Sequence, residues 1–163
     1  MAIKKTQRGF ALLISIIFMS VMLSFGLALG SLGYKQQVLA SSAIESQYAF
    51  YAADAALECA LFADQQQNLF AYPAVDPHAA PAMSCDNSVP VSTAELSYSG
   101  TQWVVTNRLS LDSGRRCADV TLYKSAPGAG GSFVFSQGYD VSCATVSSPS
   151  GARFVSRGVS AHY

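Results

Sequence analysis

The chain has 163 residues, half of them hydrophobic, and its ten Lys and Arg side chains balance ten Asp and Glu side chains. Three of the basic residues, Lys4, Lys5 and Arg8, precede Phe10, so the rest of the chain carries seven basic and ten acidic side chains. Such a chain has no general electrostatic attraction for nucleic acid, and we expect no nucleic-acid partner.

Residues 1–9 form a short basic leader, and the segment 10–33 that follows has no charged residue and no proline. At about 1.5 Å of helix rise per residue, this segment is long enough to cross the bilayer core of about 30 Å. The three basic residues of the leader outnumber Lys35, which lies after the segment. The asymmetry predicts a single-pass membrane protein with a cytoplasmic N-terminus and an extracytoplasmic C-terminal domain.

Two ordinary explanations of such a segment remain open. A cleaved secretory signal is one, because Ala28, Gly30 and Gly33 resemble a small-residue cleavage site, although 10–33 is long for it. A plain uncleaved signal anchor is the other and the stronger of the two.

The pattern predicts that the helix continues well past the membrane, over residues 10–63 as a whole. No proline occurs before Pro73, and no glycine occurs between Gly33 and Gly100. An apolar stripe recurs at steps of four, three, four and three, which keeps it on one helical face. Its members are Tyr48, Ala52, Ala55, Cys59 and Phe62. We therefore expect an amphipathic second half that packs on another part of the chain.

The composition changes over residues 64–92, where four of the six prolines lie. This segment predicts a long irregular loop, and Cys85 within it offers a covalent tie. From residue 93 the sequence is rich in Val, Tyr, Phe and Thr, and turn residues interrupt it. The expected strands are 94–99, 103–111, 116–124, 132–141 and 153–163. The prediction is an α+β fold in which the long N-terminal helix packs on a small antiparallel β-sheet spanning 93–163.

The four cysteines predict two disulfides. None of them forms a C-x-x-C pair, so the spacing does not favour a zinc site, and an extracytoplasmic location favours oxidation over free thiols. If 116–124 and 132–141 form a hairpin, Cys117 and Cys143 lie near the same end of neighbouring strands. Cys59 on the helix is then left for Cys85 in the loop. We favour Cys59–Cys85 with Cys117–Cys143, while the other two pairings remain open.

No residue pattern indicates catalysis, a metal or a cofactor, and we expect no enzyme. His78 and His162, the only histidines, have no nucleophile motif beside them. Asp112, Asp119 and Asp140 do not have the spacing of a calcium loop.

The N-terminal pattern resembles that of the type IV pilin superfamily. The matching residues are Lys4-Lys5-x-x-Arg8-Gly9 followed by Phe10-Ala11-Leu12-Leu13, the apolar segment and its amphipathic continuation. Residues 48–58 also look like the corresponding stretch of minor pilins of the PilX type. The resemblance implies that a prepilin peptidase cleaves between Gly9 and Phe10 and methylates Phe10. It implies other pilin or pseudopilin subunits as partners, first in the inner membrane and then at the cell surface.

One position departs from the pattern of major pilins. They carry a glutamate at the fifth residue of the mature chain, where this sequence has Ile14. By resemblance that carboxylate meets the N-terminal ammonium of a neighbouring subunit, and an unpaired charge in hydrocarbon costs several kcal/mol. Ile14 therefore favours a minor pilin or pseudopilin that initiates or caps a filament; a pilin subgroup that tolerates an apolar residue here is the alternative. A membrane-anchored extracytoplasmic binding domain that does not polymerise remains the second functional hypothesis.

Overall fold

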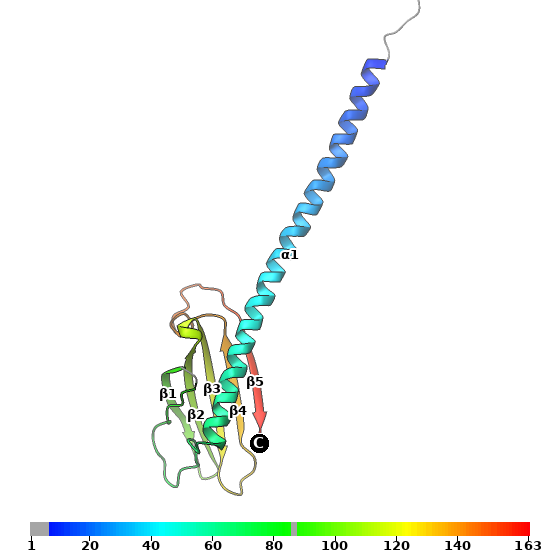
Figure 1. The fold of residues 1–163 in the computed structure, drawn as a ribbon. Helices are drawn as coiled ribbons and strands as arrows, with labels where there is room; N and C mark the ends of the chain where they lie inside the picture. Colours follow the sequence, from blue (N-terminus) through cyan, green and yellow to red (C-terminus); the bar gives the residue numbers. More distant parts are fainter. Residues whose placement is uncertain (1–6, 86–87) are drawn as a thin grey trace, which may run out of the picture. The chain divides into compact units, whose positions relative to one another are not determined.

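The structure is a computed structural model, and it describes residues 7–85 and 88–163. The first element is helix α1, Gln7–Gln65 (Figure 1). The chain divides into two compact units, Met1–Ser41 and Ser42–Tyr163, so α1 contributes to both, and each unit is described by itself. The helix ends at Gln65, and three residues later Asn68 takes a left-handed backbone conformation with φ of 52°, which asparagine tolerates better than most residues.

The second unit is built on one five-stranded sheet in the order β1-β2-β3-β4-β5, with every neighbouring pair antiparallel. Two short helical segments interrupt the strand sequence. The strands are β1 Val89–Tyr98, β2 Gln102–Leu111, β3 Arg116–Ser125, β4 Phe133–Tyr139 and β5 Ser156–His162. The helical segments are η1 Asp112–Gly114 and α2 Cys143–Ser147. The predicted α+β fold class is confirmed.

The strand boundaries differ from the predictions at both ends of the sheet. β1 begins at Val89, inside the predicted irregular segment 64–92, and β5 begins at Ser156, three residues after the predicted start. Pro90 argues against a strand in this part of the sequence, because proline has no backbone amide to donate to a neighbouring strand. An edge strand such as β1 nevertheless tolerates a proline. The intervening α2 begins where the Ser142 hydroxyl accepts a hydrogen bond from the Thr145 amide, as an N-cap residue does.

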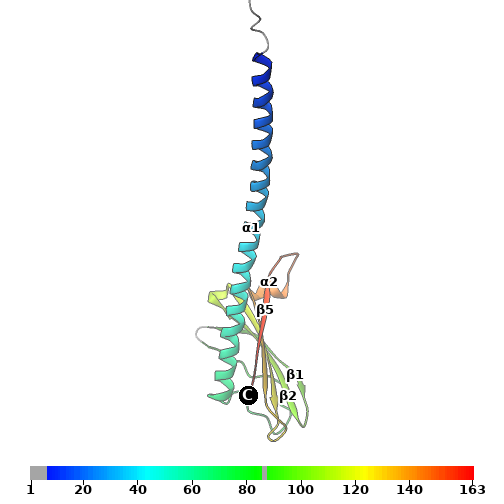
Figure 2. The same cartoon turned by 90° about the vertical axis from the view of Figure 1, so that its right-hand side faces the viewer.

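The C-terminal part of α1 covers one face of the sheet (Figure 2), and most of its buried residues are small. The predicted apolar stripe does not coincide with the helix face that packs on the sheet. Ala52 and Cys59 are buried as predicted, but Tyr48, Ala55 and Phe62 are exposed. Most of the buried positions lie one residue further along the chain, and they are Ala49, Ala53, Ala56, Ala60 and Ala63. Alanines let the helix axis approach the sheet closely. Large aromatic side chains at these positions would hold the two layers apart.

The contact between helix and sheet is closest at Gly138 on β4. A Cβ atom added there would lie 2.9 Å from the Cα of Ala53 and closer still to backbone atoms of Ala49 and Ala53. Only glycine fits at this position. The core beneath the helix comes mainly from β2, β3 and β4, with Leu109, Leu122 and Val134 among its fully buried side chains.

Both disulfides are present in the favoured pairing. Cys59–Cys85 joins α1 to the loop, with Cα atoms 5.9 Å apart. Cys117–Cys143 joins β3 to the first residue of α2, with Cα atoms 4.8 Å apart. The first bridge therefore holds the loop on α1, and the second holds α2 on β3.

Candidate interaction surface of the N-terminal helix

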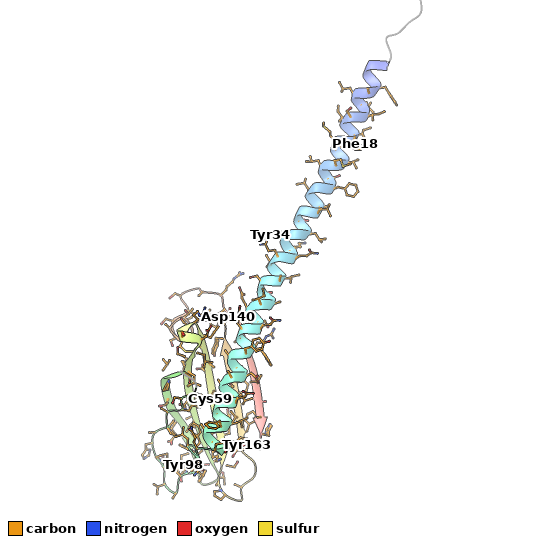
Figure 3. The ribbon with its side chains drawn as sticks, in the orientation of Figure 1. Phe18, Tyr34, Cys59, Tyr98, Asp140 and Tyr163 are labelled. Atoms are coloured by element: carbon orange, nitrogen blue, oxygen red, sulfur yellow. A yellow bond between two sulfur atoms is a disulfide. The ribbon has the colours of Figure 1, made fainter. Side chains whose placement is uncertain are left out.

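The first unit presents an apolar helix surface without any covering layer of its own. Within the described residues, α1 is the one helix long and apolar enough to cross a membrane, judged by length and composition. Every side chain described in residues 10–41 is exposed, including Phe10 at 68 % and Ile14 at 50 %. Figure 3 shows Phe18 and Tyr34 projecting from this part of the helix. This surface requires an apolar environment, either lipid or other helices.

The polar side chains within residues 10–33 are satisfied by the helix itself. The hydroxyls of Ser15, Ser20, Ser24 and Ser31 each donate to a backbone carbonyl three or four residues earlier, at 2.8–3.0 Å. Serine hydroxyls bonded in this way add no unpaired donor, so they suit a helix in hydrocarbon.

Three glycines make shallow notches on the same helix. No atom lies within 4 Å of a Cβ added at Gly26, Gly30 or Gly33, so nothing in the described structure fills these positions. Small residues spaced four apart allow a second helix to approach closely.

The predicted processing site lies at the start of α1. Gly9 and Phe10 belong to the helix, which begins at Gln7, whereas Lys4 and Lys5 of the leader lie outside the described residues. Ile14 follows Phe10 by about one turn, and residues 10–33 contain no ionisable side chain. Residues 10–33 therefore contain no carboxylate that could pair with a nearby positive charge.

The second unit has exposed aromatic side chains of its own on α1. Tyr48, Phe50, Tyr51 and Phe62 are between 44 % and 64 % exposed. The guanidinium of Arg116 lies 4.4 Å from the centre of the Tyr48 ring, close enough for a cation–π contact. A hollow of about 350 Å³ beside Tyr48 and Tyr51 reaches the Cys59–Cys85 bridge. The helix face that the sheet leaves uncovered thus offers aromatic and apolar contacts to a partner.

The three aspartates singled out in the sequence do not come together. Asp112 pairs with Arg115 at 2.7 Å, and Asp119 pairs with Arg108 at 2.6 Å. The carboxylate of Asp140 accepts a hydrogen bond from the Val155 amide. Hydrogen bonding to Asp119 raises the pKa of Arg108. Each carboxylate therefore has a structural partner of its own.

Sequence reasoning missed one cluster of possible metal ligands, formed by Asp76, His78 and Glu95, whose donor atoms all lie within 4.8 Å of one another. Asp76 also accepts a hydrogen bond from the His78 amide, and Glu95 accepts one from the Trp103 indole at 2.7 Å. Asp76 and His78 lie in the loop and Glu95 lies on β1. Because Glu95 is distant in sequence, no local motif predicts the cluster. The imidazole of His78 is 82 % exposed.

A buried ion pair lies at the C-terminal end of α1. The carboxylate of Asp64, 1 % exposed, accepts hydrogen bonds from the ammonium of Lys124 at 2.6 Å and from the hydroxyl of Tyr163 at 2.5 Å. Burial, followed by the hydrogen bond to Asp64, raises the pKa of Tyr163. The group is structural, because it joins α1 to β3 and to the residue that follows β5.

Family models, curated proteins and solved structures were compared with the chain, and none of them matches it. The function must therefore be argued from the residues of the chain itself.

Proposed function

We propose that this protein is a minor subunit of a type IV pilus or pseudopilus and that it helps to initiate or cap the filament. The observation that carries the proposal is the exposed, charge-free helix surface of residues 10–33, which follows directly on the Gly9-Phe10 junction. A plain membrane anchor needs neither that junction nor the exposed aromatic side chains that continue on α1 in the second unit.

The physics of the helix suits a subunit that moves from membrane to filament. In the inner membrane its apolar side chains contact lipid, and the serine hydroxyls are already bonded. In a bundle of pilin helices the same side chains contact other apolar side chains, so the transfer exchanges one apolar contact for another at little net cost. The two disulfides suit a sheet domain on the oxidising side of that membrane.

Ile14 supports a position at the end of the filament. A subunit with no neighbour beyond it has no second ammonium to neutralise, so the missing carboxylate costs it nothing. A subunit in mid-filament without that carboxylate leaves a neighbouring charge unpaired in an apolar bundle, at several kcal/mol for each repeat.

The second candidate function is a membrane-anchored extracytoplasmic binding domain that never polymerises. The long apolar helix and the hollow beside Tyr48 are compatible with it. The two functions differ in processing, because only a filament subunit needs the leader removed.

Processing gives the first test. In the native cell the mature chain should begin at N-methylated Phe10, and Gly9→Val should abolish cleavage, because a side chain at that position blocks the peptidase site. Mass spectrometry of the N-terminal peptide measures both, with Gly33→Val as the control that leaves cleavage intact. An intact Met1, or a start beyond Ala28, in the wild-type protein would reject the filament subunit.

Filament number gives the second test. Deleting the gene should reduce the filaments per cell several-fold while their subunit composition stays the same, and Ile14→Glu should not increase their number. Counting by electron microscopy and quantitative mass spectrometry of sheared filaments measure both. If the copy number of this chain rises in proportion to filament length, the terminal position is wrong.

A further inference from the structure

The two edges of the sheet are built differently. The edge strand β1 contains Pro90, which lacks an amide donor, and its pairing with β2 shifts register twice, at Pro90/Ser92 and at Glu95/Ser97. The loop before it also bonds to this end of the sheet, since the hydroxyl of Tyr98 donates to the carbonyl of Pro73 at 3.1 Å. Such features protect a sheet edge from further pairing.

The opposite edge strand, β5, has none of this protection. Its register against β4 is unbroken from Ser156 to His162, with no bulge and no proline. Beyond it, Tyr163 exchanges two backbone hydrogen bonds with Ser132, at 2.8 and 3.1 Å. β5 is therefore a regular strand, and within residues 7–85 and 88–163 the sheet order leaves one of its sides without a neighbouring strand. Figure 1 shows it as the last strand on its side of the sheet.

The hydrogen-bonded pair at Tyr163 fixes which backbone groups of β5 point outward. In an antiparallel pair, hydrogen-bonded and non-hydrogen-bonded residues alternate. Arg157, Val159 and Ala161 therefore bond to β4, and the amides and carbonyls of the residues between them point away from the sheet. Those residues are Ser156, Gly158, Ser160 and His162, all four of them exposed. Three of them are small, so little side-chain bulk covers the outward row.

The charge along this edge indicates what binds there. Residues 153–163 contain Arg153, Arg157 and His162 and no acidic residue. The guanidinium of Arg157 donates to the hydroxyl of Ser46 at 2.7 Å, and Arg157 is exposed. A second copy of residues 153–163 would bring two more arginines and no acid, so charge disfavours self-pairing.

We propose that the free edge of β5 binds an extended segment of a different protein, which adds to the sheet as a further strand and places an acidic side chain beside Arg157. The outward row of backbone groups supplies the affinity, and the basic side chains select an acidic segment. The inference does not depend on the filament proposal, because a non-polymerising binding domain can use the same edge.

The test uses the full chain in detergent and a fluorescein-labelled peptide that alternates valine with threonine and carries two glutamates. Fluorescence anisotropy should give a Kd in the micromolar range. Ser160→Pro removes one outward amide without touching the bonds to β4, so it should weaken binding at least tenfold. Ser160→Ala keeps that amide and should bind like the wild type. Arg157→Glu should reverse the preference between this peptide and one with lysines in place of the glutamates.

A second measurement does not rely on variants that must fold. Hydrogen exchange of the wild-type chain should show the amides of Gly158 and Ser160 slowed at least tenfold by the peptide. Unchanged exchange there, no binding at millimolar peptide, or equal binding by Ser160→Pro would overturn the proposal. A concentration-dependent dimer in sedimentation that Ser160→Pro abolishes would also overturn it, because the occupant would then be a second copy.

Discussion

Gly138→Ala should lower the free energy of unfolding of the sheet domain by about 3 kcal/mol or more, at the upper end of what overpacking costs. The added methyl group meets backbone atoms of Ala49 and Ala53 on α1, and the nearest Cα lies 2.9 Å away. Backbone cannot rotate aside as a side chain can, so the helix itself must move. Its displacement loosens the contacts of all the alanines that face the sheet.

The matched control is Gly100→Ala. No atom lies within 4 Å of a Cβ added at Gly100, which also has no positive φ, so the same chemical change should cost less than about 0.5 kcal/mol there. Urea denaturation followed by circular dichroism measures both variants at equal m-value. A cost below 1 kcal/mol at Gly138 would mean that the layers are not held together as closely as described.

The fold class and most of the strands could be predicted because their signals are local. The stretches around β2, β3 and β4 combine β-branched and aromatic residues with turn residues at their ends, and they appear within two residues of the predicted bounds. The long helix follows from the absence of proline and, beyond Gly33, of glycine. The disulfide pairing followed from hairpin geometry, although Cys143 lies in α2 and not at a strand end.

The rotation of α1 could not be predicted, because both faces of residues 42–65 are apolar. Tyr48 and Phe62 have more apolar area than any alanine, so a hydrophobicity pattern places them inside. The sheet instead selects small residues, since Gly138 on β4 brings it against the helix backbone. The preference arises from the shape of a distant strand, which no local pattern of the helix contains.

Long-range groupings were missed for the same reason. His78 has only Asp76 as an acidic neighbour in the sequence, and the fold adds Glu95 from β1 to this pair. Lys124 and Asp64 are sixty residues apart in sequence and form the most buried ion pair of the described chain. The Gly9-Phe10 junction and Ile14 do not predict any part of the fold. They predict processing and assembly, and those predictions stay open until the processing and filament experiments are done.

Lys124→Met should cost about 3 kcal/mol of unfolding free energy, the lower end for removing one partner of a buried ion pair. The carboxylate of Asp64, which is 1 % exposed, loses the ammonium that lies 2.6 Å away. Only the hydroxyl of Tyr163 then remains as a hydrogen-bond donor to it, since the second carboxylate oxygen has no partner in the described structure. The lower end applies because Lys124 itself is 20 % exposed and water partly screens it.

Two further variants separate the buried charge from the lost side-chain contacts. Asp64→Asn combined with Lys124→Met removes both charges and should recover most of the loss, because the penalty comes from an unpaired anion and not from the missing pair. Arg115→Met is the exposed counterpart: its partner Asp112 is 45 % exposed, and the loss there should stay below 1 kcal/mol. Thermal and urea unfolding of the three variants measure the comparison. If the double variant is as unstable as Lys124→Met alone, packing of the lysine stem and not the carboxylate of Asp64 sets the cost.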